Sequence, residues 1–162
     1  MKKNIIFVCT GNTCRSPMAE YLLKDMLQKE KINTFNVYSR GIAGGSVISE
    51  NSVKAIEEYN PNLKIKDHKP MTLTIDDLVQ AKLVLTMGLT HFSYIEKKLE
   101  SAYGENSPFV DFTMIRCHML KEYAGLEGNI ADPFEKDEDV YKQTRDEILD
   151  SLKASFDKIK KI

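Results

Sequence analysis

The chain has 162 residues, of which 42% are hydrophobic and 29% charged, and its formal net charge is −1. This length and apolar content favour one domain with its own core and exclude an intrinsically disordered chain. The balance of 23 basic against 24 acidic residues gives no electrostatic reason to expect nucleic acid or an anionic membrane as a partner.

The first half of the chain predicts strands that alternate with helices. The first strand is a continuous apolar run, which is typical of a central parallel strand covered on both faces. Apolar residues then recur at helical spacing after Pro17, a residue that suits the first turn of a helix. In chain order, the predicted elements are a strand at 4–8, a helix around 19–27, a strand at 36–40, a loop at 41–49 and a helix at 52–59.

The second half continues the alternation. Thr74 and Asp77 form a helix-capping pattern ahead of an apolar strand. For the fourth strand, a position within 115–120 is favoured, although 109–112 competes for the same role. The other predicted elements are a short helix at 78–81, a strand at 82–86, a helix at 89–99 and a long amphipathic helix with its apolar stripe between 141 and 159.

The predicted fold class is therefore α/β: a three-layer domain spanning residues 1–162, with a four-stranded parallel sheet and helices on both faces. In such a fold the ligand site lies beyond the carboxyl ends of the strands. The longest apolar run, residues 5–9, is too short for a membrane span or a secretory segment, so we expect a cytoplasmic protein. The three cysteines are odd in number, which disfavours a disulfide scaffold.

The loop between the first strand and the first helix carries the strongest chemical signal. It spells Cys9, five residues and Arg15, and it contains Gly11 and Asn12, which tolerate left-handed backbone. A loop that enters a helix N-terminus directs N–H groups and the positive end of the helix into one concavity, which suits a phosphate. Arg15 adds a planar fork for two phosphate oxygens. The same field favours the thiolate of Cys9, an in-line nucleophile whose reaction needs no metal or cofactor.

A second chemical element is Asp132 followed by Pro133, in a loop before the last helix. Phosphoryl transfer needs a proton for the leaving group, and a carboxylic acid on a loop restrained by proline is suited to deliver it. We therefore predict Cys9, Arg15 and Asp132 as catalytic residues. The predicted substrate-binding residues are Thr10, Gly11, Asn12, Thr13, Cys14, Ser16 and Phe134, the last at the pocket mouth.

With both elements in place, the chain resembles the low-molecular-weight protein-tyrosine phosphatases over essentially its whole length. That family has a Cys-x5-Arg-Ser loop near its N-terminus and an acid in an Asp-Pro motif near its C-terminus. The resemblance implies a cysteine-dependent phosphatase that hydrolyses phosphorylated side chains of proteins through a phosphocysteine. It also implies that Ser39, in a Ser-x-Gly motif, helps to hold the loop residue Asn12, and that His68 is a structural support.

Within the family, the loop and residues 139–147 are most similar to the bacterial protein-arginine phosphatases. Tyrosine-specific members typically have a branched aliphatic residue where Thr13 stands, so phosphoarginine is the favoured substrate and phosphotyrosine the alternative. The chain departs from the family pattern at Arg40, which replaces the usual small residue before Gly41, and at Glu135-Lys136, which replaces a Gly-Gly pair common in the arginine branch. Residues 104–114 also look longer than usual.

Three other functions remain open. A related arsenate reductase would use the same loop but would need a further cysteine pair, and only Cys117 remains. A phosphate-binding module without catalysis would have no use for Cys9 and Asp132 together. A zinc site built from Cys9, Cys14, Cys117 and His118 would lack the spacing of a known zinc finger.

The predicted partners are phosphorylated proteins, with neither nucleic acid nor a membrane, and we expect a monomer. His91 and His118 are expected to cap or pack rather than to catalyse. Cys14 lies five residues from Cys9 and is predicted to trap an oxidised Cys9 as a reversible disulfide.

Overall fold

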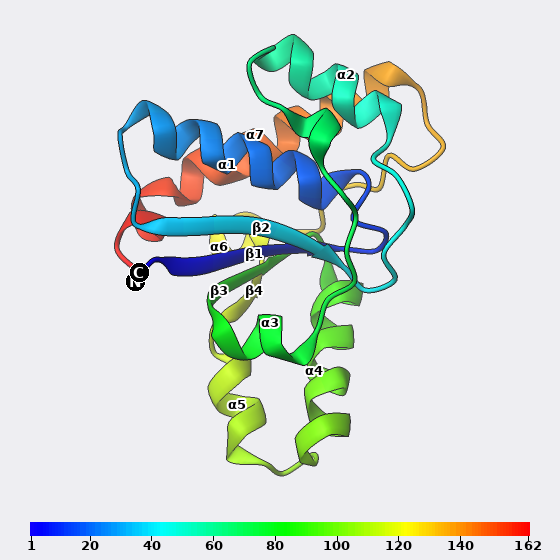
Figure 1. Cartoon of the computed structure of the whole chain (residues 1–162). Helices are drawn as coiled ribbons and strands as arrows, with labels where there is room; N and C mark the ends of the chain where they lie inside the picture. Colours follow the sequence, from blue (N-terminus) through cyan, green and yellow to red (C-terminus); the bar gives the residue numbers. More distant parts are fainter.

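The computed structural model describes residues 1–162 and places one parallel sheet between two layers of helices (Figure 1). The strands lie in the order β2-β1-β3-β4, and every neighbouring pair is parallel, which confirms the predicted α/β sheet. The strands are β1 (Lys3–Cys9), β2 (Phe35–Gly41), β3 (Ala81–Thr86) and β4 (Cys117–Met119). The fourth strand therefore lies within 115–120, as favoured.

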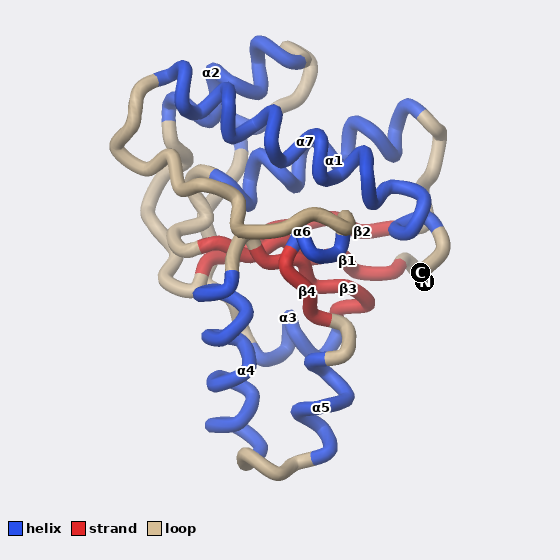
Figure 2. Tube along the Cα trace, turned by 180° about the vertical axis from the view of Figure 1, so that it is seen from behind, coloured by secondary structure: helices blue, strands red, loops and turns tan.

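The helices divide between the two faces of the sheet. Those of one layer are α1 (Arg15–Lys29), α2 (Glu50–Tyr59), α6 (Leu120–Tyr123) and α7 (Glu138–Lys160). Those of the other layer are α3 (Ile75–Gln80), α4 (Leu89–Tyr103) and α5 (Pro108–Met114). Figure 2 shows the same layers from behind. A short 3-10 turn, η1 (Ile65–Asp67), follows α2. No helix is both long enough and apolar enough to cross a membrane.

The buried strand β1 joins the two cores. Ile5 and Phe7 belong to the larger core under α1 and α7, whereas Ile6 and Val8 belong to the smaller core under α3, α4 and α5. All four side chains have no exposed surface, and burial of each contributes roughly 1.5–3 kcal/mol. The uninterrupted apolar run thus reflects a strand covered on both faces, and the residues that follow it are held on a rigid support.

Two sequence predictions need correction. Residues 109–112, the alternative fourth strand, belong to α5, because Ser107 caps that helix through the Phe109 N–H and Pro108 occupies its first turn. The helix predicted at 78–81 runs from Ile75 to Gln80, and Ala81 already belongs to β3. Helices α4 and α5 project from the sheet as a pair, and residues 104–114 form the turn between them together with α5 (Figure 1).

Candidate active site

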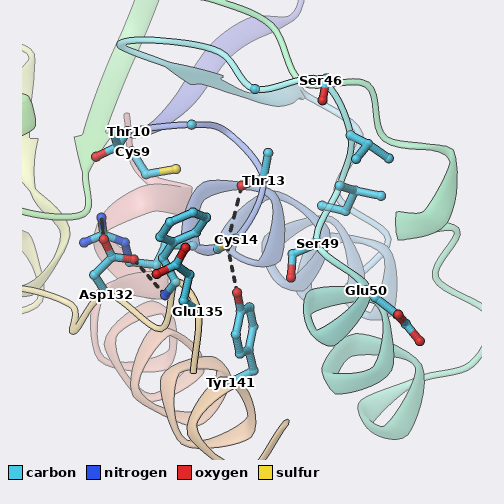
Figure 3. A pocket seen from close by; sticks show the side chains of 16 residues that line it. Cys9, Thr10, Thr13, Cys14, Ser46, Ser49, Glu50, Asp132, Glu135 and Tyr141 are labelled. Carbon is cyan, nitrogen blue, oxygen red and sulfur yellow. Dashed lines mark hydrogen bonds and ion pairs between the residues drawn. The ribbon is translucent and has the colours of Figure 1, made fainter. Parts of the chain in front are cut away.

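The loop between β1 and α1 lies at the carboxyl end of the sheet, where the order of the strands reverses between β1 and β3. A cavity of about 760 Å³ opens there (Figure 3). Its lining residues come from the end of β1, three loops and the starts of three helices: Cys9, Thr10, Gly11, Thr13, Cys14, Arg15, Gly45, Ser46, Val47, Ile48, Ser49, Glu50, Asp132, Phe134, Glu135 and Tyr141. The structure therefore brings the two predicted chemical elements to one cavity.

The carbonyl groups of the β1–α1 loop are bonded on its outer side by the segment that follows β2. The pairs are Ile42 N to Cys9 O at 3.0 Å, Ala43 N to Thr10 O at 2.9 Å, Gly45 N to Gly11 O at 2.7 Å and Ser49 N to Thr13 O at 3.0 Å. The N–H groups of residues 10–14 donate to no acceptor within the protein. Such a set of free donors beside a helix N-terminus is suited to an anion.

Gly41 allows this close approach of the two loops. A Cβ atom at position 41 would lie 2.7 Å from the Thr10 carbonyl oxygen and 3.0 Å from the Asn12 nitrogen. Any larger residue would push the β1–α1 loop away. The Ser-x-Gly motif therefore has glycine at position 41 because a side chain there would collide with the β1–α1 loop.

Asn12 is the residue of the loop whose side chain makes the most hydrogen bonds to the surrounding structure. Its backbone is left-handed, with φ of 57°, and its side chain is fully buried. Its Nδ2 donates to Ser16 Oγ and Ser39 Oγ, each at 2.9 Å, and its Oδ1 accepts from the Met71 N–H at 3.0 Å. His68 Nε2 lies 3.1 Å from the same oxygen. Ser39 therefore contacts Asn12 in the way that the family resemblance implies, and His68, for which the resemblance implies only a structural support, contacts Asn12 as well.

Glu20 extends this network and was missed by the sequence analysis. Ser39 Oγ donates to Glu20 Oε2 at 2.6 Å, and His68 Nδ1 lies 3.7 Å from the same oxygen. Burial lowers the pKa of His68, partly offset by the Glu20 carboxylate. The available signal was an acidic residue four positions after Ser16, on a helical face that also carries buried apolar residues.

Cys9 and Arg15 lie at the base of the cavity, and Asp132 lies on its wall. Cys9 Sγ lies 2.9 Å from Ser16 Oγ, close enough for the hydroxyl to hydrogen-bond a thiolate. Buried Arg15 donates from Nη1 to the Ile130 carbonyl at 3.0 Å, and its Nη2 lies 3.5 Å from Asp132 Oδ2. Asp132 is half exposed on the cavity wall. The structure thus places a nucleophilic sulfur, a fixed guanidinium and a carboxyl group around one space.

Phe134 lies where the sequence analysis expects it, at the mouth of the cavity. Its backbone N–H donates to Asp132 Oδ1 at 3.2 Å, so the turn that carries the aromatic ring also orients the carboxyl group. Phe134 is 61% exposed, which leaves it available to contact a ligand.

Tyr141 is a second residue that sequence reasoning missed. Its hydroxyl lies 3.3 Å from Cys14 Sγ, and Thr13 Oγ1 lies 3.5 Å from the same sulfur (Figure 3). Burial and the contact with Cys14 raise the pKa of Tyr141 to about 12, so its hydroxyl stays protonated at neutral pH. The amphipathic pattern of α7 identified Tyr141 as a buried position without indicating that it reaches the cavity.

The residues of the alternative zinc site are not assembled. No group of three His, Cys, Asp or Glu side chains is arranged to hold a metal ion. Cys117 packs in the smaller core, where burial raises its pKa to about 12, and His118 packs near the Tyr123 ring at 5.1 Å. A buried, protonated thiol at position 117 is also unsuited to the disulfide relay of an arsenate reductase.

Comparisons with known proteins agree with this geometry. The family described as low molecular weight phosphotyrosine protein phosphatase matches residues 4–162. A protein-arginine-phosphatase of Bacillus subtilis (strain 168) is 38% identical over 161 residues, covering 98% of this chain and 97% of the relative. The low molecular weight protein-tyrosine-phosphatase PtpB of Staphylococcus haemolyticus is 37% identical over 147 residues, covering 90% and 91% of the two chains.

A solved structure is similar over nearly the whole fold. It is a mutant of the arginine phosphatase YwlE with a phosphorylated active-site serine, and it superposes with a TM-score of 0.81 at 35% identity. The match covers 98% of this chain and 96% of the YwlE chain.

Proposed function

The chain belongs to the low molecular weight phosphotyrosine protein phosphatase family, and from that premise we propose that it hydrolyses phosphoarginine in proteins through a phosphocysteine on Cys9. Membership of the family makes it a hydrolase that acts on phosphorylated proteins. The observation that carries the proposed mechanism is the arrangement of Cys9 and Arg15 at the base of one cavity with Asp132 on its wall.

In the first step, the Cys9 thiolate attacks phosphorus, so that an S–P bond forms as the P–N bond of the substrate breaks. The departing guanidine nitrogen takes its proton from Asp132. Ser16 Oγ, 2.9 Å from Cys9 Sγ, stabilises the thiolate before attack. Arg15 and the free N–H groups of residues 10–14 bind the phosphoryl oxygens in the ground state and the transition state.

In the second step, Asp132 accepts a proton from a water molecule whose oxygen attacks the phosphorus of the phosphocysteine. The S–P bond breaks, phosphate leaves, and the Cys9 thiolate is regenerated. The YwlE structure with its phosphorylated active-site serine supports a covalent intermediate on the loop nucleophile.

Thr13 supports the choice of phosphoarginine over phosphotyrosine. A Cβ atom at Gly45 would lie 2.8 Å from Thr13 Cγ2, so the methyl group is turned toward that loop. The hydroxyl is turned toward the cavity and Cys14, without a bond to loop backbone (Figure 3). A guanidinium group brings N–H donors that lose water on entry, and a hydroxyl oxygen can accept from them.

We further propose that residues 1–162 act as a single monomeric phosphatase domain in the cytoplasm. Cys9, Arg15 and Asp132 line one cavity within a single chain, so the proposed site needs no residue from a second copy. A free thiol nucleophile functions in a reducing compartment, which supports the cytoplasm. Light scattering at working concentration tests the oligomeric state.

The experiment that tests the proposed substrate compares initial rates on two peptides of the same sequence, one with phosphoarginine and one with phosphotyrosine. We expect the larger kcat/KM on phosphoarginine. A larger value on phosphotyrosine would contradict the proposed substrate while leaving the assignment to the phosphatase family intact.

A further inference from the structure

Glu135 has an unusual backbone conformation on the cavity wall. Its φ is 60°, in the left-handed region where glycine is favoured and a glutamate is strained. It is one of three residues other than glycine with positive φ, and another, Asn12, lies in the β1–α1 loop. Glu135 is the third residue of a turn that the Lys136 N–H closes by donating to the Pro133 carbonyl at 2.9 Å, and a left-handed residue is needed at that position of such a turn.

The carboxylate of Glu135 is unpaired. It lines the cavity beside Asp132, on the wall that faces Ser49 across the opening (Figure 3). Asp132 has Arg15 at 3.5 Å, whereas no cationic or hydrogen-bond donor group pairs with Glu135. Glu50, also on the rim, pairs with Lys54 at 3.2 Å, and its carboxylate points away from the cavity in Figure 3. Glu135 is therefore the free anionic group of this wall.

The cavity is consequently polarised along its depth. Arg15 is the one basic side chain among the lining residues, and it lies at the base together with the free N–H groups of the loop. Carboxylates lie on the wall above it. A ligand that matches this polarity carries negative charge at its inner end and positive charge next to it. Phosphoarginine has this distribution, because its phosphoryl group is attached directly to a guanidinium.

The leaving group of phosphotyrosine does not match the negative charge of the cavity wall. Its ring is neutral in the ground state and gains negative charge on oxygen as the P–O bond breaks. A nearby carboxylate opposes that change by Coulomb repulsion, whereas it attracts a guanidinium. Charge on this wall therefore discriminates between the two leaving groups in opposite directions.

We propose that Glu135 is a specificity-determining residue that receives the guanidinium of a phosphoarginine side chain in the cavity. This inference rests on the proposed function. The turn holds the Glu135 side chain on the cavity wall that also carries the acid Asp132 and the ring of Phe134. Thr13 then provides a neutral acceptor, and Glu135 provides an anionic one.

The test is Glu135→Gln, which removes the charge and keeps the size of the side chain. Rates are measured on the matched phosphoarginine and phosphotyrosine peptides. Loss of one charge-assisted contact predicts a decrease of roughly tenfold in kcat/KM for phosphoarginine. For phosphotyrosine we expect an unchanged or higher kcat/KM. Glu127→Gln, an exposed glutamate outside the cavity, is the matched control and should change neither value.

A second variant separates recognition from strain. Glu135→Gly relieves the strained backbone, so it should raise the melting temperature, and it should lower the ratio of kcat/KM on phosphoarginine to kcat/KM on phosphotyrosine as Glu135→Gln does. If the ratio of the two kcat/KM values stays within twofold of wild type in both variants, the inference is wrong. Equal losses on both substrates would also overturn it, because they would show that Glu135 only shapes the loop that carries Asp132.

The kcat/KM values of the wild-type enzyme on the two peptides test the proposed function itself. If it hydrolyses phosphotyrosine but not phosphoarginine, the proposed substrate fails, and the inference fails with it. If it prefers phosphoarginine and both variants keep the wild-type ratio of the two kcat/KM values, only the role of Glu135 fails.

Discussion

His91 Nε2 lies 3.0 Å from Thr10 Oγ1, although 81 residues separate them in the chain. His91 is in the first turn of α4 and is 3% exposed, so it packs, as the sequence analysis expects, but it packs against the phosphate-binding loop. Burial and the nearby Arg15 charge lower its pKa to about 4. Its Nδ1 has no hydrogen-bond partner in the protein. The neutral imidazole is thus a support for the loop.

This burial predicts a pH-dependent stability. The unfolded chain binds a proton at His91 near pH 6.5, whereas the folded chain does so only near pH 4. Between these values the unfolded state holds more protons, so the free energy of unfolding decreases as the pH falls. From pH 6.5 to pH 5 the contribution of His91 is about 2 kcal/mol, at about 1.4 kcal/mol per pH unit.

Urea unfolding of wild type and His91→Gln at several pH values measures this contribution. The variant should show a shallower loss of stability between pH 6.5 and 5, since its side chain does not titrate. Burial also lowers the pKa of His68. Its effect on the pH dependence of stability has the same sign in both proteins, so it cancels in the difference between them. Parallel curves for the two proteins would contradict the prediction.

Cys9 and Asp132 should separate the two steps of the reaction. Cys9→Ser should fold and bind inorganic phosphate but lose turnover, because a serine hydroxyl is a much weaker nucleophile than a thiolate. Asp132→Asn should retain slow chemistry, with the pH dependence of kcat altered, because proton delivery is lost while the nucleophile remains. Steady-state rates and phosphate titrations test both. Near wild-type rates in Cys9→Ser would contradict the proposed mechanism.

Ser39 should support catalysis without touching the substrate. Ser39→Ala removes the acceptor of Asn12 Nδ2 and the donor to Glu20, and it leaves the buried Glu20 carboxylate with one partner fewer. We expect a loss of about 1–3 kcal/mol in stability. The decrease in kcat should be larger than the change in KM, because the loop loses its alignment for the transition state.

Ser46→Ala provides the comparison for Ser39. Ser46 lies on the exposed loop at the cavity, outside the Asn12 network, and its change should leave stability near wild type. Thermal unfolding and kinetics of both variants make the test. Equal stability of Ser39→Ala and wild type would show that the network is not needed to hold the loop.

The part of the site that could be predicted from the sequence is the part whose residues are contiguous in the chain. Cys9 to Ser16 are contiguous, and the apolar strand before them and the helix after them are strong local patterns, so the fold and the loop could both be inferred. The Asp132-Pro133 pair is remote in sequence. Asp132 could be predicted as a catalytic acid only because the chain also contains a phosphate-binding loop.

Other parts of the site depend on tertiary packing that no local pattern encodes. The period of α7 marks Tyr141 as buried, but only the packing of α7 beside the β1–α1 loop places its hydroxyl 3.3 Å from Cys14. The sequence likewise identifies His91 as a packing residue but does not indicate that it packs against Thr10, which is 81 residues away in the chain. The segment 109–112 competes with 115–120 for the fourth strand by pattern alone, and the capping by Ser107 makes it a helix.

Cys14 is predicted to make oxidation of the nucleophile reversible. Peroxide should convert the Cys9 thiolate to a sulfenic acid, and the Cys14 thiol then attacks that sulfur, forming an S–S bond and releasing water. Dithiothreitol should restore activity. In Cys14→Ser, oxidation should proceed further and inactivation should be largely irreversible. Recovery equal to wild type in that variant would rule out Cys14 as the trapping thiol.

Thr13 is the position at which polarity should select the substrate. In Thr13→Ile the hydroxyl that faces the cavity is replaced by an apolar group, so a guanidinium N–H that loses water on entry no longer finds an acceptor there. The expected cost is about 1–3 kcal/mol, or roughly tenfold to a hundredfold in kcat/KM for phosphoarginine. A phenyl ring needs no acceptor, so kcat/KM for phosphotyrosine should be unchanged or higher. The measurement is again the pair of matched peptides. Equal losses on both would show that Thr13 shapes the loop, since Ser52 Oγ also donates to its carbonyl at 3.2 Å, and does not choose the substrate.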